Sequence, residues 1–310
     1  MTRIDALLVA MVLIWGANFS VLKRAFAEIP PQSFNSIRIL VASAVFLAAI
    51  GAAARAQAGG RRVSRVLWTP DALTRRDWWD LAWLGIVGHC LYQLGFAGGV
   101  DLTSVANAAL LMGATPVVVA LLSMALGRER LNALHWAGVA LSVLGIYVVV
   151  GRGASFGGAT LRGDLLVLGS VFCWSTYTLG AMRLIGRHSP LFVTGVTMAM
   201  GGVPYVLIAL PQMLHTDWSA VSAWTWAALV WSGLFALNVA YLIWYIAVQR
   251  IGPSRTALYS NVVPIAALAV AAVWLGEPIT GAKAIGATAI LGGVLLTRIG
   301  RRPSGVPIEE

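Results

Sequence analysis

The 310-residue chain carries one pattern of residues twice. A first set of four residues recurs at a spacing of 159 residues: Asp5, Trp15, Arg24 and Pro31 return as Asp164, Trp174, Arg183 and Pro190. A second set recurs at a spacing of 148 residues: Pro116, Glu129, Gly138 and Gly145 return as Pro264, Glu277, Gly286 and Gly293. We therefore predict two homologous halves, 1–151 and 152–300, followed by a tail, 301–310.

The composition identifies the solvent in which these halves fold. Hydrophobic residues make up 59% of the chain and charged residues 11%, with a mean hydropathy of +0.81, whereas a soluble domain carries roughly 25% charged residues. Apolar runs of about 20 residues are long enough to cross a bilayer as helices. Ten such runs are present: 4–24, 34–54, 78–100, 104–125, 132–151, 162–184, 190–212, 222–248, 254–275 and 281–299. The predicted fold is an all-α integral membrane protein with ten transmembrane helices.

The distribution of charge predicts the orientation in the membrane. The net charge is +10, and sixteen of the 22 Lys and Arg residues fall on one side of the ten predicted helices. Positive residues favour cytoplasmic loops, so both termini are predicted to be cytoplasmic in a bacterial inner membrane. The basic loops then face anionic lipid headgroups rather than nucleic acid. Because each half has five helices, an odd number, the second half must be inverted relative to the first.

Three shorter segments allow more than one interpretation. Arg3, the apolar run and Ala25-Phe26-Ala27 resemble a cleaved secretory signal, but the same run is the repeat partner of 162–184 and is then part of the fold. Cys90 and Cys173 fall inside apolar runs, which favours packing over a disulfide or a metal site. The loop 55–76 is too short for a core of its own and is predicted to be a linker.

One predicted helix, 78–100, carries a polar and aromatic stripe. His89, Tyr92, Gln93 and Phe96 share a face of it at helical spacing, and His89 is the one ionisable residue placed near the centre of a predicted span. Polar groups are costly to leave facing lipid, so the stripe is predicted to face a central cavity; packing against another helix is the alternative. No acidic residue lies near a span centre, which disfavours a carboxylate proton pathway and a seat for cationic drugs.

The repeat predicts a matching stripe in the second half. At a spacing of 148 residues, Gln93 pairs with Tyr241 and Phe96 with Trp244. The further candidate substrate-binding residues are Trp15, Asn18, Trp174, Tyr177, Asn238, Tyr245 and Tyr259. Aromatic faces with amide and hydroxyl groups suit an amphipathic amino acid. Trp15 and Trp174 are equally explained as packing residues, and tryptophans close to span ends are assigned to the membrane interface.

Arg38 and two prolines complete the candidate residues. Arg38 lies one turn into 34–54, where it either extends to the headgroups or holds a substrate carboxylate through a bidentate contact; Lys23 is a weaker candidate for that contact. Pro116 and Pro264 are predicted to kink the interiors of equivalent helices, either as gates or as fixed bends.

The last predicted helix of each half is different. The runs 132–151 and 281–299 carry few polar groups, and Gly138 with Ser142, like Ala289 with Gly293, places small residues four apart. Such spacing allows close helix approach. These two helices are predicted to form a scaffold or a homodimer contact.

The residues resemble a known family. Ile14-Trp15-Gly16-Ala17-Asn18-Phe19, then Pro30-Pro31 and Arg38, look like the opening of the EamA family of the drug/metabolite transporter superfamily, and Gly127-Arg128-Glu129 with its echo Gly276-Glu277-Pro278 is typical of it. The resemblance covers roughly 4–299, and it implies ten helices in two inverted repeats. Within the family the chain looks most like the aromatic amino acid exporter branch.

Three classes of function remain open from the sequence. A secondary transporter that exports amino acids or other small amphipathic metabolites by alternating access is the first; a multidrug or cationic compound exporter and a non-transporting membrane binding protein are the alternatives. A membrane enzyme is disfavoured, because we find no constellation of catalytic residues and no Walker-type phosphate loop. No cofactor and no metal are predicted.

Overall fold

The computed structural model describes residues 3–68, 72–126, 132–151, 159–251, 256 and 259–299. Within these residues the secondary structure is helical and contains no strand. The predicted tail 301–310, Glu129 of the repeat and most of the predicted boundary between 222–248 and 254–275 lie outside the described residues.

The helices of the first half follow the predicted order closely. They are α1 Arg3–Ala25, α2 Pro31–Ala58, α3 Arg75–Gly85, η1 Ile86–Leu91, α4 Tyr92–Leu102, α5 Val105–Met112, α6 Thr115–Ala125 and α7 Ala133–Gly151. The predicted linker 55–76 is shorter than expected, because α2 continues to Ala58 and α3 begins at Arg75.

The helices of the second half repeat this order. They are α8 Ala159–Ile185, α9 Pro190–Leu214, η2 Trp218–Ala220, α10 Ala223–Trp231, η3 Ser232–Val239, α11 Ala240–Ile251, α13 Val263–Trp274 and α14 Gly281–Ile299. Serine N-caps begin several of the helices: Ser104, Ser189 and Ser222 each accept a hydrogen bond from the backbone N–H three residues on, which satisfies one of the free donors of a first turn.

Among the described residues, seven helical stretches are long and apolar enough to cross a membrane: Arg3–Ala25, Pro31–Ala58, Arg75–Leu102, Val105–Ala125, Thr160–Ile185, Pro190–Leu214 and Ala223–Ala247. Three shorter apolar helices occupy Ala133–Val149, Val263–Trp274 and Gly281–Leu296. The described part of the chain is thus a helical, multi-pass membrane protein.

Two of the long stretches contain a π-helix where an uninterrupted α-helix was expected. In the first half η1 lies between α3 and α4, and in the second half η3 lies between α10 and α11. The two segments fall on each other at the 148-residue spacing of the repeat. A π-helical turn widens the helix locally and often occurs at functional sites. His89 lies in η1 and Asn238 lies in η3.

The predicted proline kinks are wrong in their form. Pro116 lies in the first turn of α6, after a break at Gly113–Ala114, and Pro264 lies in the first turn of α13. Proline is well tolerated in a first turn, where its missing N–H is not needed. The two breaks lie together, since a Cβ on Gly113 would come within 2.8 Å of the Pro264 ring.

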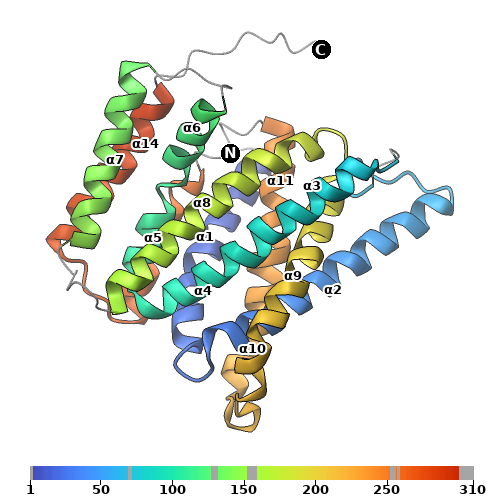
Figure 1. The fold of residues 1–310 in the computed structure, drawn as a ribbon, viewed down its shortest axis with the longest axis horizontal. Coiled ribbons are helices and arrows are strands. Elements are labelled where there is room, and N and C mark those ends of the chain that lie inside the picture. The colour runs from blue at the N-terminus through green and yellow to red at the C-terminus, as the bar shows by residue number, and fades with distance from the viewer. Residues whose placement is uncertain are drawn as a thin grey trace.

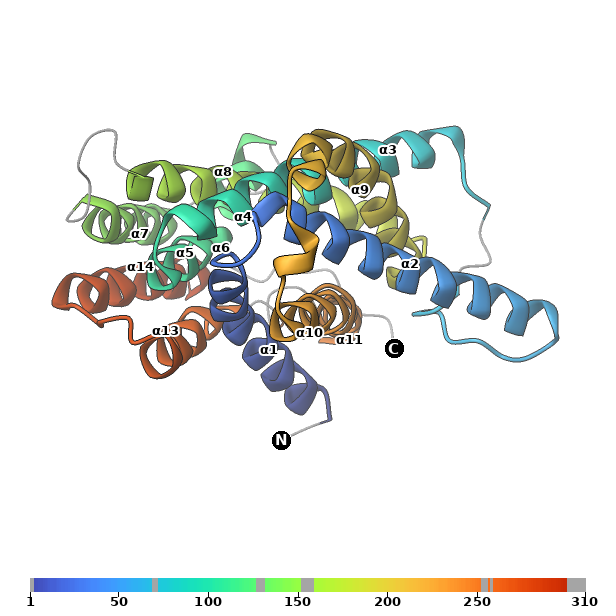
Figure 2. The same cartoon turned by 90° about the horizontal axis from the view of Figure 1, so that it is seen from below.

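The packing of the helices joins the two halves. α2 packs along α9 and α7 along α14, α1 contacts α13 and α11, and α8 contacts α4, α5 and α6. In Figure 1, α7 and α14 lie side by side at one edge of the molecule and α2 lies at the other. The turned view of Figure 2 separates the same pair from α2. Most of the buried hydrophobic side chains form one core cluster between these edges.

Small residues hold α7 and α14 together. A Cβ on Gly293 would lie 2.2 Å from Ser142 Oγ and 2.4 Å from the Gly138 carbonyl oxygen, and one on Gly145 would lie 2.8 Å from Ile290. Ser142 Oγ also donates to the Ile290 carbonyl at 3.2 Å. The small-residue faces predicted from the sequence therefore meet within one chain, while a homodimer through these two helices stays a prediction.

Candidate functional site

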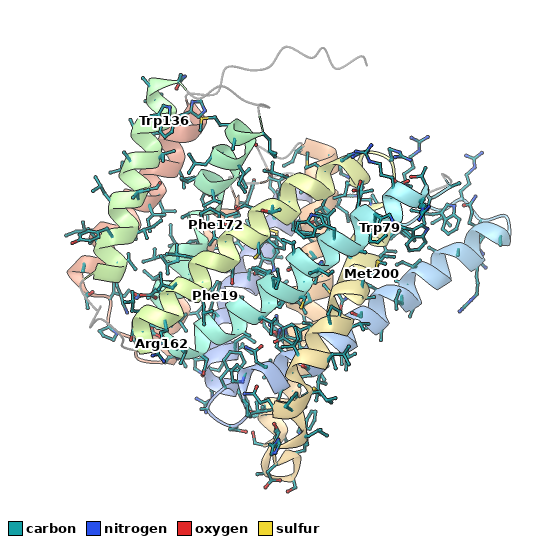
Figure 3. The ribbon with its side chains drawn as sticks, viewed as in Figure 1. Phe19, Trp79, Trp136, Arg162, Phe172 and Met200 are labelled. Atoms are coloured by element: carbon teal, nitrogen blue, oxygen red, sulfur yellow. The ribbon has the colours of Figure 1, made fainter. Side chains whose placement is uncertain are left out.

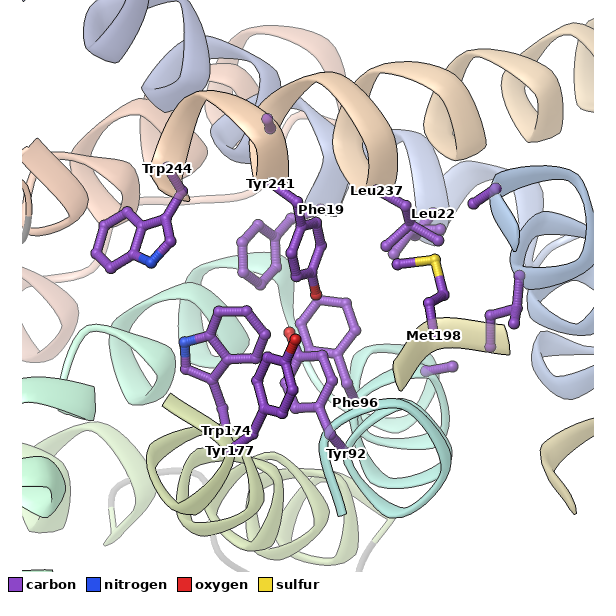
Figure 4. Packing of buried hydrophobic residues seen from close by; sticks show 14 of the residues in the cluster. Phe19, Leu22, Tyr92, Phe96, Trp174, Tyr177, Met198, Leu237, Tyr241 and Trp244 are labelled. Carbon is purple, nitrogen blue, oxygen red and sulfur yellow. The ribbon is translucent and has the colours of Figure 1, made fainter. Parts of the chain in front are cut away.

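A cluster of aromatic rings from four membrane segments lies in the middle of the core. Trp174 on α8 is its hub, with ring centroids 5.2 Å from Tyr92, 5.6 Å from Tyr177 and 5.3 Å from Tyr241. Figure 4 shows these rings turned toward one another between α4, α8 and α11. We refer to the connected rings as the central cluster: Trp15, Phe19, His89, Tyr92, Phe96, Trp174, Tyr177, Tyr241 and Trp244.

The outer members of the central cluster come from both halves. Trp15 on α1 lies 5.9 Å from Tyr241 and 5.8 Å from Trp244. Phe96 stacks on Tyr92 at 5.5 Å and meets Phe19 at 5.4 Å. The structure thus brings together the two stripes predicted from the repeat. Phe19 was not predicted, although it directly follows Asn18 in the sequence.

His89 is fully buried and lies at the edge of these rings. Its ring is 4.9 Å from that of Tyr177, and its Nε2 lies 3.2 Å from Thr197 Oγ1 on α9. Its Nδ1 has no hydrogen-bond partner. Sequence reasoning missed Thr197, yet the 159-residue spacing pairs it with Arg38, which would have identified it.

Arg38 is buried within the protein rather than extended to the headgroups, so the snorkelling interpretation is wrong. Its side chain is 1% exposed, and its guanidinium donates to Gln93 Oε1 at 2.9 Å and to Ser232 Oγ at 3.1 Å. Ser232 in turn donates to Asn18 Oδ1. The remaining donor, Arg38 Nε, has no partner. His89 is therefore not the only ionisable residue deep in the protein.

The π-helix η3 supplies further polar contacts. Asn238 Nδ2 donates to the Ala42 carbonyl at 2.9 Å, while Asn238 Oδ1 has no partner. Trp15 Nε1 donates to the Ala236 carbonyl in the same π-helix at 3.0 Å. Tyr245, also predicted, is 2% exposed and belongs to the same core. A π-helical turn thus lies next to the rings in each half.

The structure does not bring Tyr259, a residue predicted from the sequence, into the central cluster. Its hydroxyl donates to Asp5 Oδ1 at 2.8 Å, in the first turn of α1. Asp5 precedes Trp15 by ten residues, or about 15 Å along a helix. Tyr259 therefore ties α1 to the segment before α13, about three turns from the central cluster.

Lys23 binds backbone carbonyls rather than side chains of the central cluster. Its Nζ donates to the carbonyls of Val100 at 3.1 Å, Asp101 at 2.5 Å and Thr103 at 2.8 Å. These are the free carbonyls at the C-terminus of α4, where a cation is favourable. Lys23 is a helix cap, which leaves Arg38 as the candidate for a carboxylate contact.

Two other regions are distinct from the central cluster. An open groove of about 420 Å³ lies beside the C-terminal part of α2, bordered by Arg61, Arg62 and Leu191, and it shares no lining residue with the cluster. Trp79 and Trp136, assigned to the membrane interface, are 69% and 48% exposed. Figure 3 shows both at the periphery, with Phe19 in the interior of the same view. Among the described residues no group of three His, Cys, Asp or Glu side chains could hold a metal ion.

The arrangement has the properties of a site for a small amphipathic molecule. Aromatic faces accept an apolar side chain, and Arg38 supplies a buried positive charge whose natural partner is a carboxylate. The unpartnered atoms of His89, Asn238 and Arg38 are costly to bury unless something bonds to them. Such atoms are candidates for contacts with a ligand.

Comparison with known proteins agrees with this geometry. The EamA-like transporter family model matches residues 2–151 and again residues 161–299. The chain is 28% identical to a probable amino-acid metabolite efflux pump of Salmonella typhimurium (97% of this chain, 97% of the relative). It is 30% identical to a probable terminal-alkyne amino-acid exporter of Streptantibioticus cattleyicolor (95% and 94%). It is also 26% identical to an uncharacterized transporter, YyaM, of Bacillus subtilis (94% and 92%).

One solved crystal structure shares the fold. It aligns with a TM-score of 0.64 at 22% identity and covers 97% of this chain and 100% of that one. The family match extends over both halves and nearly the whole length. The chain therefore belongs to the EamA-like transporter family.

Proposed function

We propose that this protein is a secondary transporter of the bacterial inner membrane that exports small amphipathic amino acids, aromatic or otherwise apolar, through the central cluster. The observation that carries the proposal is the buried Arg38 next to a group of aromatic rings from both halves. Two of the relatives bear names that refer to amino-acid export. A buried positive charge disfavours the cationic drugs considered as an alternative.

The proposal includes the full ten-helix, inverted-repeat architecture. The contacts between helices support it, because they pair under exchange of the halves: α1 on α13 corresponds to α8 on α5 and α6, and α4 on α8 corresponds to α11 on α1. Exchange of the halves converts α2 into α9 and α7 into α14, so the contacts within these two pairs stay the same. The double match to the family model supports the division into 1–151 and 152–300. Cytoplasmic termini follow from the loop charges.

In this mechanism each residue has a defined task. Arg38 binds the substrate carboxylate, and Gln93 and Ser232 hold its guanidinium in place. Trp174 and its neighbouring rings enclose the apolar side chain. His89 and Asn238 offer hydrogen bonds to the substrate amino group, through atoms that have no partner in the protein.

Flux through reconstituted vesicles tests the proposal. Purified protein is placed in liposomes, and uptake of labelled aromatic, apolar, acidic and cationic compounds is measured with and without a pH gradient. We expect saturable flux of aromatic and apolar amino acids, driven by their own gradient. Binding without flux would identify a membrane binding protein, a chemically altered compound an enzyme, and flux of cations alone a drug exporter.

A further inference from the structure

Two contacts join the halves at places that the repeat makes equivalent. In the first, Asp77 in the first turn of α3 accepts two hydrogen bonds from Arg187, at 3.0 and 3.2 Å, and lies 3.6 Å from His188 Nε2. Asp77 also forms a capping box with Thr74. Asp77 and His188 are buried, with side chains 2% and 1% exposed. We call this contact the α3 latch.

The second contact joins the corresponding elements with the two halves exchanged. Glu28, in the turn between α1 and α2, accepts from Ser222 N at 3.1 Å and from Thr225 Oγ1 at 2.8 Å. Ser222 is the N-cap of α10, and its hydroxyl accepts from Thr225 N. We call this contact the α10 latch.

The two latches are repeats of each other. Thr74 and Asp77 fall on Ser222 and Thr225 at the 148-residue spacing, and Glu28 falls on Arg187 at the 159-residue spacing. In each latch the loop after the first helix of one half binds the first turn of the third helix of the other half. The carboxylate comes from the helix in the α3 latch and from the loop in the α10 latch.

The latches lie at opposite ends of the molecule. Arg187 and His188 directly precede α9, and Glu28 directly precedes α2. α2 and α9 run antiparallel, because Gln32 at the start of α2 contacts Gln212 near the end of α9. The 25 residues of α9 extend over about 37 Å, so that distance separates the two ends.

A glycine lies close to the point where each latched helix meets its π-helix. A Cβ on Gly85, at the end of α3, would lie 2.6 Å from the Thr197 carbonyl oxygen. Gly233, in η3, is its partner at the 148-residue spacing, and a Cβ there would lie 3.4 Å from the Arg38 carbonyl oxygen. The backbones therefore cross closely at Gly85 and Thr197, whereas the contact of Gly233 with Arg38 is an ordinary van der Waals contact. The side chains of Thr197 and Arg38 both contact the site.

We propose that α3 and α10 are alternating gates. Each swings on the adjoining π-helix as its hinge, and each is held closed by its own latch. Both latches are closed in this structure. A substrate that binds Arg38 or His89 acts on the hinges directly, since both residues lie beside them. This inference rests on the proposed transport function, but it predicts accessibility independently of any substrate.

Labelling from each side of the membrane tests the gates. In a Cys90→Ala/Cys173→Ala background, Met198→Cys places a buried reporter thiol on α9, beside Leu237 (Figure 4). An impermeant maleimide is then added to vesicles of either orientation. We expect Arg187→Ala to raise labelling about tenfold from the α3 side alone, because the Asp77 carboxylate, which is 2% exposed, loses the two hydrogen bonds from Arg187 and keeps those from Thr74. Arg187 itself is 46% exposed, so the contrast with the control pair below lies in the burial of the carboxylate. Glu28→Gln should raise it from the α10 side alone.

The neighbouring pair Asp80 and Arg183 supplies the control. These side chains lie 3.6 Å apart and are 33% and 48% exposed, and exposed pairs contribute little. Asp80→Asn should therefore leave labelling unchanged. Unchanged labelling in Arg187→Ala and Glu28→Gln, or equal labelling from both sides, would overturn the alternating gates.

A disulfide links the gates to transport. Glu28→Cys/Thr225→Cys should block flux when oxidised and restore it when reduced, while Leu141→Cys/Gly292→Cys across α7 and α14 should not affect flux in either state. Flux that persists through the oxidised α10 latch would contradict the gate. Absence of amino-acid flux in the reduced protein would instead contradict the proposed substrate, and the labelling experiment would still decide the gates.

Discussion

The central cluster and the α7–α14 pair join the two halves in opposite ways. The pair brings together small residues, Gly138, Ser142, Gly145 and Gly293, with backbones in contact. The central cluster brings together large aromatic rings, a buried arginine and polar atoms without partners. Close backbone packing gives a rigid seam, whereas unpartnered polar atoms reduce stability. We propose from this difference that the pair maintains the fold and the cluster carries the function.

Removing the hub of the cluster should have the largest effect. Trp174→Ala deletes the ring in contact with Tyr92, Tyr177 and Tyr241, and burial losses of this size cost about 3–5 kcal/mol. We expect a lower unfolding temperature in detergent and loss of flux. Trp79→Ala, at a ring that is 69% exposed, is the matched control and should change neither. A fully stable, active Trp174→Ala protein would remove the ring from both roles.

Adding a single methyl group at one of two neighbouring glycines tests how closely α7 and α14 pack. A Cβ at Gly293 meets Ser142 Oγ at 2.2 Å, whereas one at Gly292 meets its nearest neighbour, in Leu141, at 3.6 Å. Overpacking costs about 1–3 kcal/mol, so Gly293→Ala should lower the unfolding temperature and Gly292→Ala should not. Flux per folded molecule should stay at the wild-type value in both. A change in substrate preference in Gly293→Ala would contradict the assignment of substrate binding to the central cluster alone.

The stripe of His89, Tyr92, Gln93 and Phe96 should affect transport more than stability. His89→Ala removes the contact to Thr197 and a candidate hydrogen-bond acceptor for the substrate amino group. We expect flux to fall about tenfold, as the loss of one or two hydrogen bonds predicts, at unchanged membrane expression. Tyr92→Ala should act in the same direction. Normal flux in both variants would exclude this stripe from the site.

The smallest expected effect concerns pH and the α10 latch. Hydrogen bonds from Ser222 and Thr225, with a contribution from nearby Arg24, lower the pKa of the Glu28 carboxyl below its ordinary value of 4.5. A lowered pKa in the folded state means that the contribution to stability is present above 4.5 and is lost as the pH falls through the folded pKa. The difference in unfolding temperature between wild type and Glu28→Gln should shrink with acidification below 4.5. A constant difference would exclude the ionised latch.

The depth of a residue in the membrane was predictable from the sequence, whereas the neighbours that its side chain contacts were only partly predictable. The repeat spacing correctly grouped Trp15, Trp174 and Tyr241 because equivalent residues share a depth. Tyr259 instead contacts Asp5 in the first turn of α1, ten residues before Trp15. Arg38 was assigned either a surface or a ligand role, because its partners Gln93 and Ser232 come from distant helices.

Local geometry was the other limit. The π-helices η1 and η3 have no signature in the hydrophobic runs from which the helices were predicted. The breaks before Pro116 and Pro264 were predicted as kinks, because both prolines lie inside uninterrupted apolar runs of the sequence. The 159-residue spacing, however, contained unused information: it pairs Arg38 with Thr197 and Glu28 with Arg187.

Equilibrium binding to Arg38 is the most direct test of the central claim, that the cluster is a carboxylate-binding transport site. Labelled phenylalanine and phenylalaninamide are titrated into purified wild type and Arg38→Gln. Hydrogen bonds to charged groups contribute about 1.5–3 kcal/mol, so wild type should prefer the acid by at least about tenfold. Arg38→Gln should bind both equally. Equal affinity of wild type for acid and amide would contradict the account.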